Sequence, residues 1–206
     1  MQETKQISHY RQQLKHRIVS TALQMFADHG IKAVKMDDIA TALAISKRTL
    51  YEIYDNKEVL LYESIKSYHL QTSEQIETFA ATAADVMDVI LYVYSRKMQQ
   101  IRRTTPVLYT DLEKYPRVLE YLRGERQKKH DETIRFMLRG VSEGFFRPEV
   151  NYELTLRMME GLGSYLRDNR LYQQYSYEEI LRSLLFITLR GICTQKGIDR
   201  LDAYLK

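Results

Sequence analysis

The stretch Ile45–Leu61, "ISKRTLYEIYDNKEVLL", decides the fold of this chain. It predicts a short helix that Ser46 caps and that ends near Tyr54, followed at once by a strongly apolar helix that Asn56 can cap. Leu50 and Tyr54 are spaced i, i+4, so both are expected to point inward. The short helix then turns mostly polar side chains outward, and burial alone does not explain them.

The composition is that of an ordinary globular protein rich in helices. The chain has 206 residues, of which 44% are hydrophobic and 28% are charged, and only 8 Gly and 3 Pro interrupt it. No apolar run approaches the roughly 18–20 residues that a membrane span needs, and the N-terminus lacks an apolar signal-peptide core. We therefore expect a cytoplasmic protein with no membrane partner. The one cysteine, Cys193, excludes an intrachain disulfide and a cysteine-cluster metal site.

The positive charge is concentrated at the N-terminal end. Residues 1–57 hold nine Lys/Arg and six Asp/Glu, an excess of three, whereas the other 149 residues hold 22 and 21. A basic end on a nearly neutral body suggests an anionic partner at that end. The alternative is a chance excess on the surface.

Helical periodicity runs along the whole sequence, and no strand-like alternation interrupts it. The first helix ends at Gly30, which suits a left-handed cap, and a second short helix precedes a tight turn at Ala44. Later helices are expected to begin at Pro106 and Pro116, with the second of these running to Gly144. The predicted class is all-α, with about nine helices. The predicted domains are a helix-turn-helix domain, 1–57, and a helical body, 58–206.

Two short helices joined by a tight turn and braced by a longer one make a helix-turn-helix, whose second helix is sized for the major groove of B-DNA. Lys47, Arg48 and Thr49 are left on its outer face, where they can reach base edges or phosphates. The Tyr51 phenol can reach a phosphate, and Lys57 lies on the first turn of the next helix, which favours an anion. The alternatives are a solvated helix face for the cations and a packing role for the tyrosine.

The segment Arg17–Ile65, "RIVSTALQMFADHGIKAVKMDDIATALAISKRTLYEIYDNKEVLLYESI", resembles the N-terminal domain of the TetR family of bacterial transcriptional regulators. The resemblance implies a homodimer that binds double-stranded operator DNA, and a C-terminal body that binds a small-molecule effector and dimerises. It also implies a repressor that the effector releases. Two positions depart from the family: Ala44 stands in a turn where Gly is frequent, and Lys35 stands where Ser or Thr often caps the second helix. Lys35 nevertheless puts a cation near the expected DNA backbone.

The body offers candidates for an effector cavity and for a dimer interface. Aromatic and Met side chains at helical spacing can line a cavity, although such residues also build plain cores; they are Tyr92, Met98, Tyr109, Phe136, Met137, Met158 and Tyr165. The last two expected helices, 151–168 and 176–194, carry more apolar residues than one core-facing stripe needs. Their predicted interface positions are Leu154, Met158, Leu162, Leu184, Ile187 and Gly191.

An enzyme is not expected. The sequence has no Gly-rich phosphate loop, no HExxH and no evident nucleophile–base pair, and we expect no catalytic residues, no cofactor and no metal. The alternative function from another class is a helical DNA-associated protein that acts architecturally or recruits partners, without a small-molecule effector.

Overall fold

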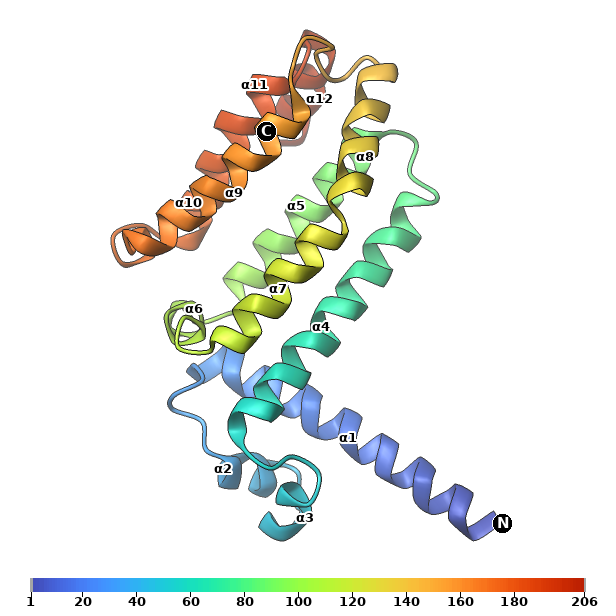
Figure 1. Ribbon diagram of the computed structural model, residues 1–206, viewed down its shortest axis with the longest axis vertical. Helices are drawn as coiled ribbons and strands as arrows, with labels where there is room; N and C mark the ends of the chain where they lie inside the picture. Colours follow the sequence, from blue (N-terminus) through green and yellow to red (C-terminus); the bar gives the residue numbers. More distant parts are fainter. Residues whose placement is uncertain (1, 206) are drawn as a thin grey trace. The chain divides into compact units, whose positions relative to one another are not determined.

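The computed structural model describes the backbone of residues 2–205 and the side chains of residues 9–166 and 168–204. Over this range its regular secondary structure is helical apart from one isolated antiparallel bridge between Phe146 and Cys193, so the all-α class is confirmed (Figure 1). The first half runs through α1 Gln2–His29, α2 Met36–Ala42, α3 Lys47–Tyr51, α4 Lys57–Ala80, α5 Val86–Arg102 and α6 Pro106–Leu112. The second half runs through α7 Pro116–Lys128, α8 His130–Ser142, α9 Tyr152–Asp168, α10 Tyr177–Leu184, α11 Arg190–Ile192 and α12 Gln195–Leu205.

The chain forms two compact units, each made of two segments. The first comprises Met1–Ser73 with Arg103–Gly124, and the second comprises Glu74–Arg102 with Glu125–Lys206. Helices α4 and α7 each begin in the first unit and end in the second. The division into a DNA-binding domain, 1–57, and a helical body, 58–206, is a functional one. It stays a prediction, because these units are defined by compactness alone.

The first unit is built around the first three helices. In it α1 contacts α2 and α6, and α2 contacts α3. Phe26, Ile39 and Leu50 have no exposed surface, and Tyr54 is buried with them, as its spacing predicted. Burying an apolar side chain of this size contributes roughly 1.5–3 kcal/mol, so this core accounts for the rigidity of the three-helix unit.

Helix α6 is fastened to the turn that follows α1. Gly30 has a φ of 82°, as expected for a left-handed cap, and a Cβ there would lie 2.8 Å from Val107 Cγ1. The buried carboxylate of Asp111 accepts the backbone N–H of Lys32 at 2.7 Å. Glycine is therefore required at this turn both for its backbone conformation and for the close approach of α6.

The second unit is arranged around α5, which contacts α8, α10 and α12. Met87, Phe146 and Leu201 are fully buried in its core. A Cβ at Gly140 would come within 2.2 Å of the Phe146 ring, so the absence of a side chain at that position lets the ring pack onto α8. Among the described residues, no helix combines the length and apolarity that a membrane crossing requires.

Several helix boundaries differ from the expectation. α1 begins at Gln2, well before the apolar pattern that starts at Ile18. The sequence did not predict this start, because the first half of the helix carries little apolar periodicity. The single helix expected from Pro116 to Gly144 is interrupted at Lys129 and forms α7 and α8. The last expected helix consists of α10, a π-helical turn at Leu185–Leu189 and α11, and α12 follows it.

Candidate nucleic-acid interface

Helix α3 is short, capped and one-sided. The Ser46 hydroxyl accepts the backbone N–H of Thr49 at 3.0 Å, so Ser46 is the N-cap that the sequence predicted. The Thr49 hydroxyl lies 2.8 Å from the Ser46 hydroxyl and is half-buried. With Leu50 buried, the exposed side chains of the helix are Lys47, Arg48 and Tyr51. If Thr49 contacts a base, its hydroxyl must do so while it is also hydrogen-bonded to the Ser46 hydroxyl that caps the helix.

Both cations of α3 are paired with carboxylates. Lys47 forms an ion pair with Asp37 of α2, and Arg48 Nε donates to Glu52 Oε1 at 2.8 Å. The hydrogen bond to Asp37 raises the pKa of Lys47, and the hydrogen bond to Glu52 does the same for Arg48. Both side chains therefore remain charged and are oriented, and DNA has to displace an acidic partner or use the N–H groups that the ion pair leaves unused.

The turn between α2 and α3 places Ala44, where glycine is frequent in the family, in a strained left-handed backbone conformation. Ala44 has a φ of 53°, a region where a side chain costs about 1–2 kcal/mol and glycine costs nothing sterically. The Ile45 N–H donates to the Ala40 carbonyl at 3.0 Å and closes the turn. The angle between the two helices is thus held at an energetic cost.

Lys35 ends the loop that joins α1 to α2, and Lys57, the first residue of α4, reaches back to that loop. The Lys57 ammonium donates to the carbonyls of Ile31 and Val34, both at 2.9 Å, and lies 3.5 Å from the carbonyl of Lys32. The Lys35 side chain is exposed, while its backbone N–H donates to the Asp38 carboxylate at 2.8 Å. Asp38 thus supplies part of the cap that Lys35 cannot, and Lys57 braces the loop.

All six residues predicted to contact DNA belong to the first unit. Lys35, Lys47, Arg48 and Tyr51 are exposed on it, whereas Thr49 and Lys57 are partly buried and already hydrogen-bonded. The sequence did not reveal the acidic partners of α3. Asp37 lies ten residues before Lys47, and only the folded turn brings the two together.

The predicted effector residues do not form one cluster. Tyr109 belongs to the first unit and the other six to the second. Met98 is buried, Tyr92, Phe136 and Met137 are half-buried, and Met158 and Tyr165 are exposed.

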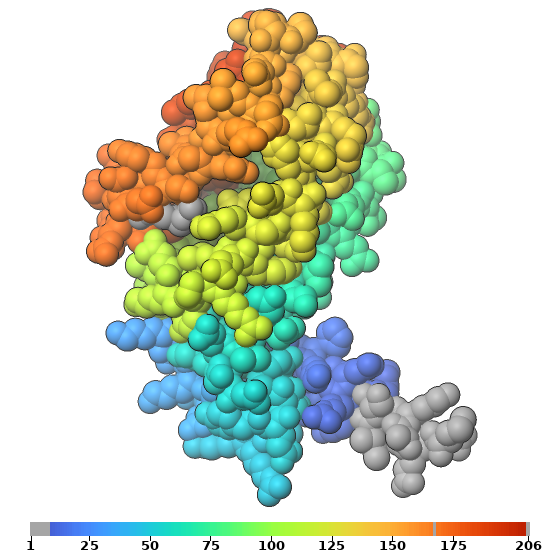
Figure 2. All heavy atoms as spheres, viewed as in Figure 1, coloured from blue at the N-terminus to red at the C-terminus, as the bar shows by residue number. Residues whose placement is uncertain are grey.

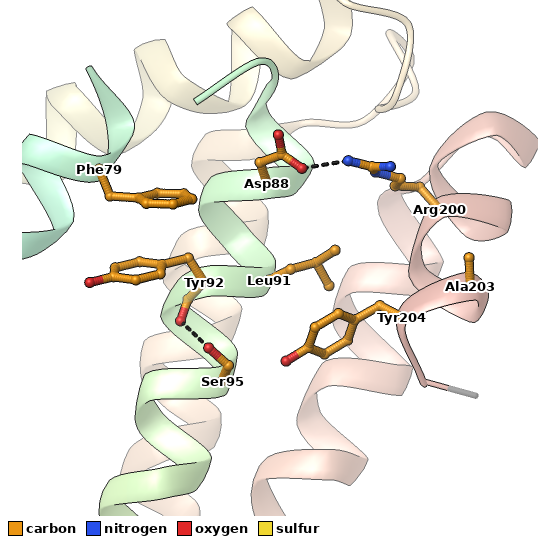
Figure 3. Close-up of a pocket in the computed structure, with 8 residues that line it drawn as sticks. All are labelled: Phe79, Asp88, Leu91, Tyr92, Ser95, Arg200, Ala203 and Tyr204. Atoms are coloured by element: carbon orange, nitrogen blue, oxygen red, sulfur yellow. Dashed lines mark hydrogen bonds and ion pairs between the residues drawn. The ribbon is translucent and has the colours of Figure 1, made fainter. Parts of the chain in front are cut away.

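One of these residues, Tyr92, lines a cavity of about 410 Å³ in the second unit (Figure 3). Its ring stacks on Phe79, with centroids 4.1 Å apart and planes 8° from parallel. An Asp88–Arg200 ion pair lies at one end of the cavity, and the Tyr204 ring lies across from Tyr92. The remaining lining residues are Leu91, Ser95 and Ala203. Tyr92 is the one lining residue that the sequence predicted. Three of the others lie on α12, a helix that the sequence did not predict, and four lie on α4 and α5.

The residues predicted for a dimer interface are largely exposed. Leu154, Met158 and Ile187 expose 54%, 66% and 72% of their surface. Gly191, four residues after Ile187, is exposed as well. Leu162 and Leu184 are half-buried. Ile187 lies in the π-helical turn at Leu185–Leu189, which changes the direction of the side chains that follow it.

Residues 18–63 match the family model described as bacterial regulatory proteins of the tetR family. The HTH-type transcriptional repressor KstR2 of Mycolicibacterium smegmatis is 24% identical over 194 residues, which is 87% of this chain and 91% of that protein.

Two solved structures are similar in fold over nearly the whole chain. The ketosteroid transcriptional regulator KstR2 of Mycobacterium tuberculosis has a TM-score of 0.54 at 20% identity, with 87% of this chain and 95% of that one covered. A transcriptional regulator from Cytophaga hutchinsonii has a TM-score of 0.66 at 17% identity, with 86% and 97% covered. Similarity at these identities concerns the fold.

Proposed function

We propose, from the premise that the chain belongs to the TetR family of bacterial transcriptional regulators and binds DNA sequence-specifically, that it is a homodimeric repressor which a small molecule releases from its operator. The observation that carries the DNA-binding part is the helix-turn-helix of α2 and α3, with its capped second helix and exposed Lys47, Arg48 and Tyr51. We place this activity in the cytoplasm, and we propose no enzymatic reaction for the chain.

Base reading and backbone binding are divided between two sets of side chains in this proposal. Lys47 and Arg48 read base edges once DNA has displaced Asp37 and Glu52 from them. Tyr51 and Lys35 bind phosphates, which position the protein without carrying sequence information. Lys57 keeps its two 2.9 Å bonds to loop carbonyls, and a phosphate replaces its longer, 3.5 Å bond to the Lys32 carbonyl.

The proposed dimer forms through α9 and the segment from α10 to α11. Exposed Leu154, Met158 and Ile187 are apolar surface that water solvates poorly, and a second copy of the chain is the partner that closed two-fold symmetry provides. Two copies would set two α3 helices about 34–36 Å apart, one helical turn of DNA. The operator is then expected to be a palindrome or nearly so.

The proposed effector site is the cavity at Tyr92. Its volume lies within the range of ligand pockets, and its aromatic walls with an ion pair at one end suit a ligand that combines an apolar body with a polar group. Phe79, in the wall, lies near the end of α4, whose first residue is Lys57. A ligand that binds the two conformations of this helix unequally changes operator affinity, and one that binds them equally changes nothing.

Selection of bound duplexes from a random DNA pool tests the proposal directly. We expect enrichment of a two-fold symmetric sequence that binds at least about a thousand-fold more tightly than unselected DNA. Uniform binding to all duplexes would instead favour an architectural role. A Tyr92→Ala variant should keep operator affinity and lose its response to any ligand found by screening.

A further inference from the structure

Helix α1 is much longer than the helix-turn-helix requires. It begins at Gln2 and has 28 residues, whereas the match to the family model begins at residue 18. Within the part whose side chains are described, three exposed cations precede that point: Arg11, Lys15 and Arg17. No Asp or Glu occurs between residues 4 and 27, so this stretch carries uncompensated positive charge.

This segment is part of the folded unit. Leu14 is buried in the core of the first unit and fixes the helix one turn before Ile18. Arg11 and Lys15 are spaced i, i+4, so they lie on one side of the helix, next to the Leu14 stripe. At 1.5 Å per residue, Arg11 lies about 10 Å further along the axis than Ile18. The cations are therefore held at a defined reach beyond the three-helix core.

The cations of α1 and those of α3 differ in their partners. Lys47 and Arg48 are both paired with carboxylates, whereas no ion pair involves Arg11, Lys15 or Arg17 within the described part of the chain. In Figure 2 the dark blue atoms are the part of α1 that follows residue 8, and they lie at the surface of its unit. Of these two helices, only α1 has described cations without an ion pair.

We propose that Arg11 and Lys15 form a second DNA contact, which binds phosphates outside the base pairs that α3 reads. The inference rests on the proposed function and adds a sequence-independent contact to it. A duplex carries about one phosphate charge per 1.7 Å of axis, so two cations about 6 Å apart along the helix can each meet a phosphate and release its counterion. An anionic membrane is a poorer partner, because a membrane-surface helix needs a broad exposed apolar face and here Tyr10 is the only large apolar side chain exposed between residues 9 and 17.

The test uses one selected duplex in two lengths. The short form is trimmed to the base pairs that the wild type selects, and the long form adds about ten base pairs, one helical turn, of unselected sequence at each end. The variant is Arg11→Gln with Lys15→Gln. The matched control is Arg123→Gln with Arg135→Gln, which removes the same charge from exposed positions on α7 and α8. Affinity is measured against salt concentration for each pair of protein and duplex.

We expect the variant to lower the salt slope on the long duplex by about 1.8 per protomer, since each phosphate contact contributes about 0.9. Binding to the short duplex and the preferred sequence should stay the same, and the control should match the wild type. Equal losses on both duplexes, or an unchanged slope on the long one, would overturn the inference while leaving the regulator intact. So would wild-type binding to anionic lipid vesicles that the variant loses, if the slopes on DNA were unchanged. If the wild type selected no duplex at all, the proposed function would fail first.

Discussion

Two regions of the molecule differ in how far their apolar side chains are buried: the three-helix core of the first unit and the α9–α10 region of the second unit. In the first, Phe26, Ile39 and Leu50 are completely buried within the chain. In the second, Met158 on α9 and Ile187 in the π-helical turn remain mostly exposed. The three-helix core of the first unit buries its apolar side chains and turns polar ones outward. The α9–α10 region has apolar surface that the chain itself does not cover, which is the physical basis for the proposed dimer.

The largest expected effect tests the exposed side of this comparison. Ile187→Glu puts a charge in the proposed interface, where it must lose its water, so we expect a folded monomer. Operator affinity should fall about a thousand-fold or more, toward that of non-specific binding, because a monomer contacts only one half-site of the operator. Sedimentation and DNA titration measure the two effects.

The control for this change is Leu70→Glu, which alters an exposed apolar residue of α4 in the first unit. It should remain dimeric with normal operator affinity. A dimeric Ile187→Glu variant at micromolar concentration would break the comparison, because the exposed apolar side chains of α9–α10 would then need another explanation.

The next effect tests whether the first unit is complete in itself. Asp111→Ala leaves the Lys32 N–H without its acceptor next to the Gly30 turn, so we expect a loss of about 1–3 kcal/mol in the free energy of unfolding. The oligomeric state should not change. Denaturant unfolding compares it with Asp28→Ala, an exposed carboxylate bonded to Gln24, which should stay within about 0.5 kcal/mol of the wild type. Equal losses for the two variants would mean that α6 is not fastened through Asp111.

The polar side of the first unit is tested on α3. Lys47→Ala or Arg48→Ala should weaken operator binding about 5- to 150-fold and relax the preference at one base pair in each half-site. Lys35→Ala should weaken all sequences alike and lower the salt slope by about 0.9 per protomer. Selection experiments with each variant distinguish the two outcomes. A changed sequence preference in Lys35→Ala would contradict the division between base reading and backbone binding.

The smallest effect concerns the strained turn. Ala44→Gly removes a side chain from a residue with a φ of 53°, and we expect a gain of about 1 kcal/mol in stability. Ala42→Gly, in the last turn of α2, should instead lower stability by up to about 1 kcal/mol. Thermal unfolding at a fixed protein concentration compares them. A lower stability of Ala44→Gly would show that the backbone at this turn is not strained.

Helix beginnings were the most predictable features. Ser46, Asn56 and Asn151 each accept a backbone N–H three residues ahead, as their positions in the sequence indicated. Pro106 and Pro116 begin their helices for an equally local reason. The start of α1 and the whole of α12 were missed. The first has little apolar periodicity, and the first turn of the second holds Gly197, a poor helix former, where a Cβ would lie 2.5 Å from the Phe145 carbonyl oxygen.

The all-α class, the helix-turn-helix and the basic character of the N-terminal end follow from residues within a few positions of each other, because caps, turns and helical faces are local chemistry. Contacts between distant residues follow from packing alone. Lys57 meets carbonyls 23 and 26 residues before it, and the Asp88–Arg200 pair that closes one end of the cavity joins residues 112 apart. No spacing rule predicts such pairs, because the core decides which helix faces meet. The tertiary structure therefore decided which cations are already paired, where the cavity lies and which apolar side chains are left exposed.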